Sequence, residues 1–137
     1  MISAISCMAL AVYFEARNQP LAGQLAVAHV IANRVASKHY PNTVWEVIRQ
    51  GPTYASGHPR KHRCQFSFWC DGKAETIHDY EAWRTAVRIS TAVWDTSSPH
   101  IDVSEGATHY HTTEVSPQWR YTMKVTVKIG SHIFYKP

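Results

Sequence analysis

The stretch from residue 2 to residue 17, ISAISCMALAVYFEAR, decides the fold of this chain. It is almost wholly apolar and rich in Ala, Leu and Met, which at this length suits a buried helix better than a strand. The triplet Asn18-Gln19-Pro20 ends the pattern. The sequence therefore predicts a buried helix over residues 2–17.

Three more helices are expected further along the chain. Residues 21–37 carry apolar side chains at helical spacing on one face. A Thr-x-x-Glu capping box at Thr43 and Glu46 predicts a short helix that ends before Gly51. A last helix is expected from Asp79, which can cap it, to about residue 94.

The final third of the chain changes to the periodicity of a strand. Apolar and polar side chains alternate strictly from Trp119 to Ile129, and Gly130-Ser131 offers a tight turn into residues 132–135. The predicted fold is therefore α+β, mainly helical with a small C-terminal antiparallel sheet. At 137 residues the chain is long enough for one domain and too short for two, so residues 1–137 are expected to form a single domain.

The net charge of the chain is compatible with several kinds of polyanionic partner and does not distinguish between them. A formal net charge of +4 and a hydrophobic share of 45% describe a folded protein whose surface favours polyanions, such as nucleic acid, anionic lipid or bacterial cell wall. The one basic cluster, at residues 58–63, lies in a long loop, and long loops often line a site. A solvated loop and a loop that faces the substrate both remain open.

The apolar opening and the cysteines bear on the compartment. Residues 2–12 lack a basic flank and are shorter than the roughly 20 apolar residues that span a bilayer, so they predict neither a signal peptide nor an anchor. Cys7 is expected to be buried in the first helix. Cys64 and Cys70 flank five residues and could form a local bridge in an oxidising compartment, so their pairing is left open.

Glu15 is the exceptional residue of the first helix. A carboxylate among Tyr13, Phe14 and Ala16 is costly to ionise if it is buried, so its pKa should rise toward the value that a general acid needs near neutral pH. In the alternative, Glu15 points to solvent or pairs with Arg17 or another cation at the end of the helix. From these residues alone, the two interpretations carry equal weight.

Several ordered blocks of sequence resemble the SleB-like cell wall hydrolases. The blocks are Tyr13-Phe14-Glu15-Ala16-Arg17, Gly23-Gln24-Leu25-Ala26-Val27-Ala28, Asn33-Arg34-Val35, Tyr40-Pro41-Asn42-Thr43-Val44, Cys64-Gln65-Phe66-Ser67-Phe68-Trp69-Cys70-Asp71-Gly72, Gly106-Ala107-Thr108-His109-Tyr110, Val115-Ser116-Pro117-Gln118-Trp119 and Ile129-Gly130-Ser131-His132-Ile133-Phe134-Tyr135. The departures are small: Asn18 stands where the family often has Gly, and Trp45 where it often has Cys. Neither change removes a catalytic group.

This resemblance implies a lysozyme-like fold related to lytic transglycosylases. It also implies cleavage of peptidoglycan glycan strands, between N-acetylmuramic acid and N-acetylglucosamine, without a cofactor. The Glu of the first block is the catalytic acid in this family, which implies that role for Glu15. One carboxylate is enough to form an anhydro product, whereas hydrolysis usually needs two.

The remaining candidate site residues are chosen for sugar binding. Gln65, Phe66, Ser67, Tyr110 and Trp119 supply the mixture of flat apolar faces and hydrogen-bonding groups that a sugar requires, although Phe66 and Trp119 also suit a core. Asp71 is the best candidate for a second carboxylate, but its position before Gly72 favours a turn residue. For Asn33-Arg34 we favour a clasp from helix to loop over a role in the site.

Two rival functions remain. His109-x-His111, like His58-x3-His62, could supply zinc ligands to a wall amidase or endopeptidase, but a zinc site still needs a third ligand, and the sequence has no His-Glu-x-x-His motif. A non-catalytic module that binds wall or nucleic acid is the other rival, although basic residues form no stripe.

We expect a monomer that binds no nucleic acid and does not insert stably into a membrane. We also expect synthesis in the cytoplasm and action at the wall as a phage-type endolysin, with a bacterial wall-remodelling or germination enzyme as the alternative.

Overall fold

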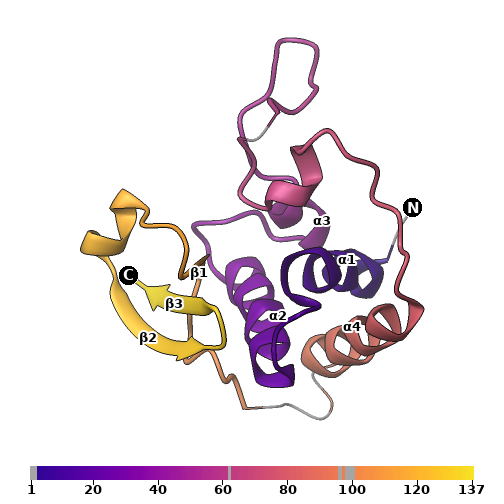
Figure 1. The fold of residues 1–137 in the computed structure, drawn as a ribbon. Coiled ribbons are helices and arrows are strands. Elements are labelled where there is room, and N and C mark those ends of the chain that lie inside the picture. Colours follow the sequence, from indigo (N-terminus) through magenta and orange to yellow (C-terminus); the bar gives the residue numbers. More distant parts are fainter. Residues whose placement is uncertain (1–2, 62, 96, 98–100) are drawn as a thin grey trace.

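The computed structural model describes residues 3–61, 63–95, 97 and 101–137, in which helices surround a central helix and a small sheet stands at one side (Figure 1). The central helix is α1, Ala4–Ala16, and it packs against α2, Leu21–Ala36, α3, Val44–Ile48, and α4, Tyr80–Trp94. The sheet lies on the α2 side of this group. Within the described residues, no helix is both long and apolar enough to cross a membrane.

Helix α1 forms the centre of the core, as its composition predicts. Its buried residues lie on all sides of the helix, because neighbouring elements cover it on several faces. Ser3 caps its first turn by accepting a hydrogen bond from the backbone N–H of Ser6. Cys7 is buried and free, as expected, whereas the predicted start at residue 2 lies outside the described residues.

The other predicted helices are confirmed, with small changes at their ends. Asp79 caps α4 through the backbone N–H of Ala82, and Thr43 caps α3 through that of Glu46. The carboxylate of Glu46 accepts from the Thr43 hydroxyl at 2.9 Å, so the reciprocal bond of a full capping box is replaced by a side-chain pair. Helix α3 is short and ends at Ile48.

The C-terminal sheet is antiparallel, as predicted, but the strand predicted from Trp119 begins later and a further strand precedes it. Its strands are β1, His109–Thr112, β2, Lys124–Ile129, and β3, His132–Lys136, in the order β1-β3-β2. The prediction of a strand from Trp119 is wrong, because this residue lies in the 3₁₀ helix η2, Gln118–Thr122. An irregular register between Val125 and Val127 also breaks the alternation, and Val125 is left exposed.

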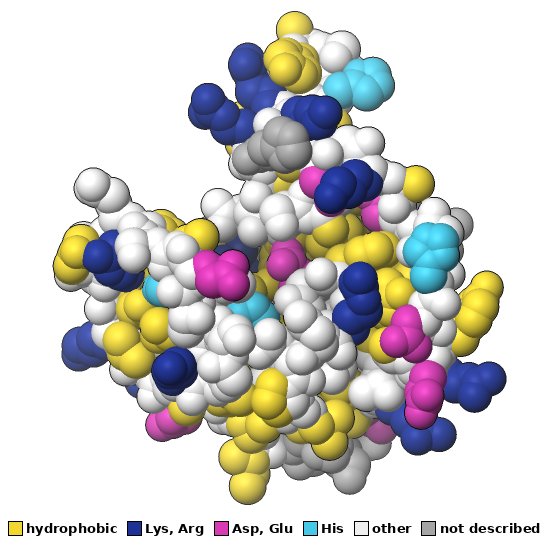
Figure 2. Space-filling view, in the orientation of Figure 1, with side chains coloured by type: hydrophobic (Ala, Val, Ile, Leu, Met, Phe, Trp, Pro, Cys, Tyr) yellow, Lys and Arg dark blue, Asp and Glu magenta, His cyan; other side chains and the backbone are white. Residues whose placement is uncertain are grey.

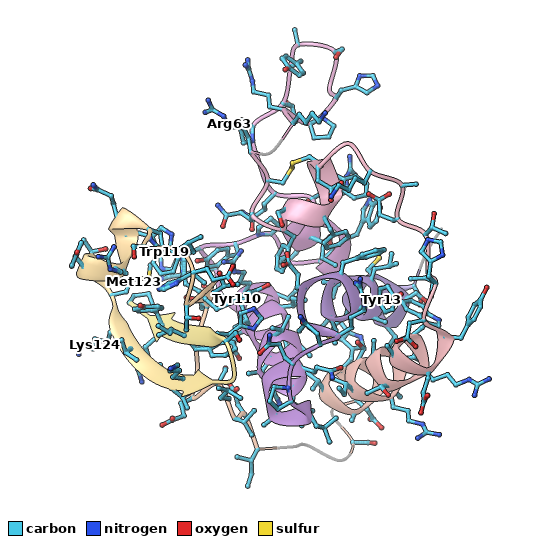
Figure 3. All side chains as sticks on the ribbon, viewed as in Figure 1. Tyr13, Arg63, Tyr110, Trp119, Met123 and Lys124 are labelled. Atoms are coloured by element: carbon cyan, nitrogen blue, oxygen red, sulfur yellow. A yellow bond between two sulfur atoms is a disulfide. The ribbon has the colours of Figure 1, made fainter. Side chains whose placement is uncertain are left out.

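A disulfide joins Cys64 to Cys70 and closes the segment that ends in the 3₁₀ helix η1, Ser67–Cys70. This settles the pairing that the sequence left open. The loop before it projects from the body of the molecule, and nearly all of residues 51–61 are exposed (Figures 1 and 3). An isolated bridge between Thr53 and Pro59 gives this loop the form of a hairpin.

Helix α2 connects the sheet to the helical core. The Asn33 amide donates 2.9 Å hydrogen bonds to the Asp102 carboxylate and to the Ala107 carbonyl, and the Arg34 Nε donates to the Thr108 carbonyl at 2.7 Å. The favoured interpretation of Asn33-Arg34 as a clasp is therefore confirmed. Gly130 has a positive φ of 57° and lies against Pro20, where a Cβ atom would come within 2.9 Å of the ring.

Candidate active site

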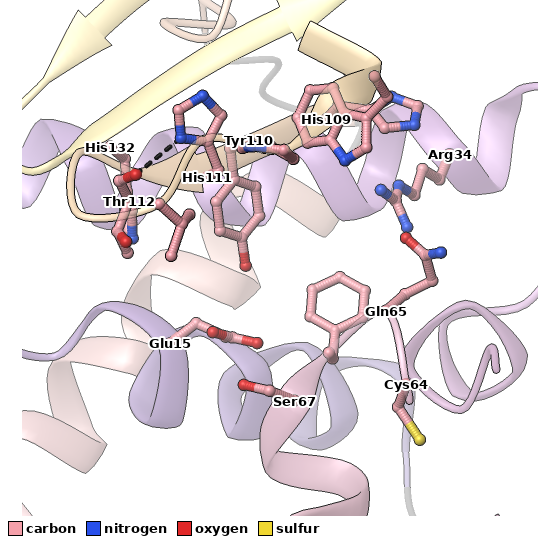
Figure 4. Close-up of a pocket in the computed structure, with 14 residues that line it drawn as sticks. Glu15, Arg34, Cys64, Gln65, Ser67, His109, Tyr110, His111, Thr112 and His132 are labelled. Carbon is pink, nitrogen blue, oxygen red and sulfur yellow. Dashed lines mark hydrogen bonds between the residues drawn. The ribbon is translucent and has the colours of Figure 1, made fainter. Parts of the chain in front are cut away.

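A cleft of about 450 Å³ opens between the end of α1, the η1 turn and strand β1. Figure 2 shows this hollow on the viewed face, between the sheet and the helices, and Figure 4 shows its lining. Its walls are formed by Glu15, Arg34, Cys64, Gln65, Phe66, Ser67, His109, Tyr110, His111, Thr112, Val115, Pro117, Trp119 and His132. Glu15 and every predicted substrate contact except Asp71 therefore meet in one place.

Glu15 lies near the end of α1 and is the one acidic side chain among the described residues that line the cleft. The backbone N–H of Ser67 donates a hydrogen bond to its carboxylate. Burial raises the pKa of Glu15 to about 7, and the bond from Ser67 opposes that rise only in part. Near neutral pH, Glu15 is therefore protonated in about half of the molecules, and a general acid must carry its proton in this way.

Arg17 does not neutralise Glu15, which was the alternative interpretation. Its guanidinium lies over the ring of Tyr13, 4.7 Å from the ring centre, and its Nη1 donates to the Tyr13 carbonyl at 3.4 Å. No ion pair between Arg17 and a carboxylate is found within the described ranges. The charge of Glu15 therefore lacks a cation close enough to lower its pKa.

Tyr110 faces Glu15 from strand β1. Figures 3 and 4 show its side chain between the sheet and the helices, with the hydroxyl directed toward the Glu15 carboxylate. Burial and the negative charge of Glu15 raise the pKa of this phenol well above its usual value. Tyr110 therefore keeps its proton over the working pH range and can donate a hydrogen bond into the cleft.

Arg34 is the cation that lines the cleft. The sequence favours a clasp from helix to loop for this residue and does not predict its place in the site. It is 4% exposed, and its guanidinium lies between the rings of Tyr40 and Phe66, 4.9 and 5.6 Å from their centres. Its Nη1 has no hydrogen-bond partner among the described residues. Burial lowers the pKa of Arg34, but a guanidinium starts so high that it stays charged.

Histidines and one tryptophan form the sheet side of the cleft. The ring of Trp119 packs against those of His109 and His111, at centroid distances of 5.1 and 5.7 Å. Burial and the charge of Arg34 lower the pKa of His109 to about 4, so this ring is neutral near pH 7. His132, which the sequence did not single out, lies behind Tyr110 with its pKa lowered by burial and by His111.

The nitrogens of His109 and His111 already bond to protein groups. His111 Nδ1 lies 2.7 Å from the Thr112 carbonyl, which can only accept, so Nε2 is left to accept from the Tyr135 hydroxyl at 2.8 Å. His109 Nδ1 lies 2.9 Å from the Thr108 hydroxyl. In the part of the chain that the structure describes, no group of three His, Cys, Asp or Glu side chains could hold a metal ion. His62, half of the other histidine pair, lies outside the described residues.

The η1 segment places three predicted residues on the opposite wall. Gln65 is fixed by a 2.9 Å hydrogen bond from its backbone N–H to the Gln50 carbonyl, and the disulfide closes the turn that follows. Phe66 is 1% exposed, so its ring packs in the core and shows only an edge to the cleft. Ser67 begins η1, and its backbone N–H is the group that bonds Glu15.

Asp71 lies outside the cleft. Its Oδ1 accepts a 2.8 Å hydrogen bond from the backbone N–H of Lys73, as in a turn around Gly72, which adopts a positive φ of 80°. The residue lines a separate hollow with Ser67 and Lys73. This placement fits the turn interpretation better than the role of a second carboxylate.

Comparison with known proteins gives consistent relatives. A family model described as Cell Wall Hydrolase matches residues 18–135. The spore cortex-lytic enzymes of Bacillus cereus and Bacillus subtilis are 34% and 31% identical to the chain, over 96% and 95% of its length. These matches cover 44% and 36% of the two relatives, so the chain spans less than half of their length.

Two solved structures share the fold. The catalytic domain of the Bacillus cereus SleB protein has a TM-score of 0.65 and 31% identity, and the match covers 97% of this chain and 89% of that one. The catalytic domain of the germination-specific lytic transglycosylase SleB from Bacillus anthracis has a TM-score of 0.68 and 34% identity, with coverage of 97% and 93%. The lysozyme-like α+β fold that the resemblance implies is thus confirmed.

Proposed function

The chain belongs to the SleB-like family of cell wall hydrolases, and from that premise we propose that it cleaves the glycan strands of peptidoglycan with Glu15 as general acid. The observation that carries the proposal is the state of Glu15. This carboxyl group faces an open cleft, is protonated in part near neutral pH and forms no ion pair with a cation of the described residues. The bond cleaved is that between N-acetylmuramic acid and N-acetylglucosamine.

In the first step, Glu15 donates its proton to the glycosidic oxygen. The bond from this oxygen to C1 of the muramic acid breaks, the N-acetylglucosamine leaves with its hydroxyl, and positive charge develops at C1. Glu15 is now a carboxylate, and it lies close enough to that charge to stabilise it. The N–H of Ser67 supports this ionised state, because it donates to the carboxylate.

In the second step, the Glu15 carboxylate takes the proton of the muramic acid 6-hydroxyl. The oxygen of this hydroxyl attacks C1 and closes a 1,6-anhydro ring, so Glu15 regains its proton and no water is consumed. The route needs one carboxylate, which agrees with the single acidic side chain of the described cleft lining. Hydrolysis usually uses a second carboxylate, and Asp71 lies in the neighbouring hollow.

The other cleft residues are proposed to bind and orient the sugars. The hydroxyl of Tyr110 is a donor directed to the cleft, the buried guanidinium of Arg34 places a positive charge at its wall, and Trp119 offers apolar surface. Gln65 and Ser67 add polar groups on the opposite wall. The same chemistry serves cell lysis and wall remodelling, and a role as an endolysin stays a prediction.

The test compares the loss of turbidity of purified peptidoglycan with wild type, Glu15→Gln and Glu81→Gln. Glu15→Gln keeps the shape of the side chain and removes the acid, so lysis should fall by at least about a hundredfold. Glu81 is exposed in the first turn of α4, and its variant should match wild type. Normal lysis by the Glu15 variant would overturn the assignment.

A further inference from the structure

A second hollow of about 310 Å³ borders the active-site cleft at Ser67, which lines both. We call it the side hollow, and its walls are Phe14, Arg17, Ser67, Phe68, Asp71, Lys73, Ala74 and Glu75. Phe14 precedes Glu15 in α1, so the hollow begins beside the proposed acid. Figure 2 shows apolar surface with basic and acidic side chains around it on the same face as the cleft.

The side hollow carries charges of both signs. Arg17 and Lys73 are its cations, and Asp71 and Glu75 are its carboxylates. Over the described residues the one ion pair is between His29 and Asp102, so no carboxylate lies within 4.0 Å of Arg17 or Lys73. Four charged groups thus share a small hollow without pairing to one another.

The hollow has an apolar floor, and contacts within the chain fix Arg17 and Asp71 beside it. The rings of Phe14 and Phe68 stack at a centroid distance of 5.2 Å and an interplanar angle of 18°. Arg17 is held over Tyr13 by its ring contact and by the bond to the Tyr13 carbonyl. The turn that begins with Asp71 follows directly on the disulfide at Cys70.

The ligand that fits this arrangement is a short peptide with a free carboxylate and amide N–H groups. A neutral sugar would gain little from four charges and would partly desolvate them. The carboxylate of such a peptide can pair with the cations, and its amide N–H groups can donate to the carboxylates of the hollow, while its aliphatic parts cover the Phe14–Phe68 floor. The volume lies at the lower end of the range for small-ligand sites, which suits one or two amino-acid residues.

We propose that the side hollow binds the peptide stem of the muramic acid whose glycosidic bond is cleaved. The stem is attached through the lactyl group of that sugar, so it leaves the strand within one ring of the bond that Glu15 protonates. Ser67 lies at the junction of the cleft and the hollow, where the stem would leave the sugar and enter the hollow. The inference rests on the proposed function of the cleft, and it makes the stem a determinant of specificity.

The test measures binding to Glu15→Gln, so that no substrate is consumed. One ligand is a soluble glycan fragment with its peptide stems, and the other is the same fragment after an amidase has removed them. The dissociation constants, measured by calorimetry, should differ about tenfold in favour of the stem-bearing fragment. Adding Arg17→Gln or Lys73→Gln should lower this ratio at least about threefold.

The controls are Arg88→Gln and Lys128→Gln, which remove the same charges from exposed positions on α4 and β2. They should leave the ratio unchanged. Because both ligands are measured on one sample, partial unfolding of a variant cancels in the ratio. Equal affinity for the two fragments, or a ratio that neither Arg17→Gln nor Lys73→Gln alters, would overturn the proposal. Failure of wild type to cut either fragment would contradict the function of the cleft instead, and the ratio would still be measurable.

Discussion

At the scale of single residues, the proposed chemistry depends on the environment of Glu15. Its helix supplies apolar neighbours, which hold the proton on the carboxyl group, and η1 supplies the Ser67 N–H, which favours the ion. The balance gives a pKa of about 7. A group that must give a proton and then take one back works best near this value.

This raised pKa predicts how stability depends on pH. The folded chain keeps a proton on Glu15 that the unfolded chain loses above pH 4.5, so the stabilisation is full below that pH and is lost as pH rises through about 7. At about pH 8, the free energy of unfolding of Glu15→Gln, measured with urea, should therefore exceed that of wild type by about 2 to 3 kcal/mol. Near pH 4 the difference should vanish. The same difference at both pH values would contradict a raised pKa.

Tyr110→Phe tests the donor opposite Glu15. The phenol lies inside the cleft with its pKa raised, and losing its hydroxyl would remove the hydrogen bond that we propose it donates to the substrate. We expect kcat/KM for peptidoglycan solubilisation to fall about tenfold or more, with the fold unchanged by circular dichroism. Tyr80→Phe, on a residue that is 69% exposed, is the matched control. Equal loss in both variants would exclude a specific role for Tyr110.

The sequence indicated a candidate site residue only where a side chain was unlike its neighbours. Glu15 was found because a carboxylate in an apolar helix is anomalous, and the family blocks then implied its role. Arg34 and His132 carry no such signal, since an Arg at a helix end and a His in a strand are ordinary. Their place in the cleft depends on how α2 and the sheet pack.

At the scale of elements, the clasp of Asn33 holds the sheet on the helices. Asn33→Ala would leave the Ala107 carbonyl without this donor and would remove one of the two hydrogen bonds to Asp102 Oδ2, which keeps that from the Gly106 N–H. Unfolding in urea should reveal a loss of about 2 kcal/mol. Asn42→Ala, at an exposed position before α3, should cost far less. Similar losses in the two variants would argue against the clasp.

The disulfide between Cys64 and Cys70 is expected to stabilise the η1 wall of the cleft. Reduction should lower the free energy of unfolding by about 2 kcal/mol, because the closed segment is short. Activity should fall with it, since Ser67 lies within that segment and bonds Glu15. Cys64→Ser should behave like reduced wild type and should not respond to reductant. Full activity after verified reduction would show that η1 holds its shape without the bridge.

Element prediction was most reliable for the helices. Periodicity and caps identified α2, α3 and α4, because these signals are local. The start of β2 was missed because residues 118–122 alternate by composition yet form a 3₁₀ helix after Pro117. Alternation alone does not separate these two conformations, and the irregularity near Val125 depends on pairing with β3.

At the scale of the whole molecule, the cleft is assembled from distant parts of the chain. Glu15, Ser67 and Tyr110 come from α1, η1 and β1. Their approach follows from packing, which spacing along the sequence does not define. The order of the family blocks supplied what local physics did not, and the comparisons confirm that family.

Analysis by mass spectrometry of the soluble fragments released from purified peptidoglycan by wild type and by Glu15→Gln tests the central claim most directly. The mechanism predicts glycan fragments with 1,6-anhydromuramic ends from wild type and none from the variant. Reducing ends would instead require hydrolysis and a second catalytic group. Cleaved peptide stems on intact glycan, or identical fragments from both proteins, would contradict Glu15 as the acid that cuts the strand.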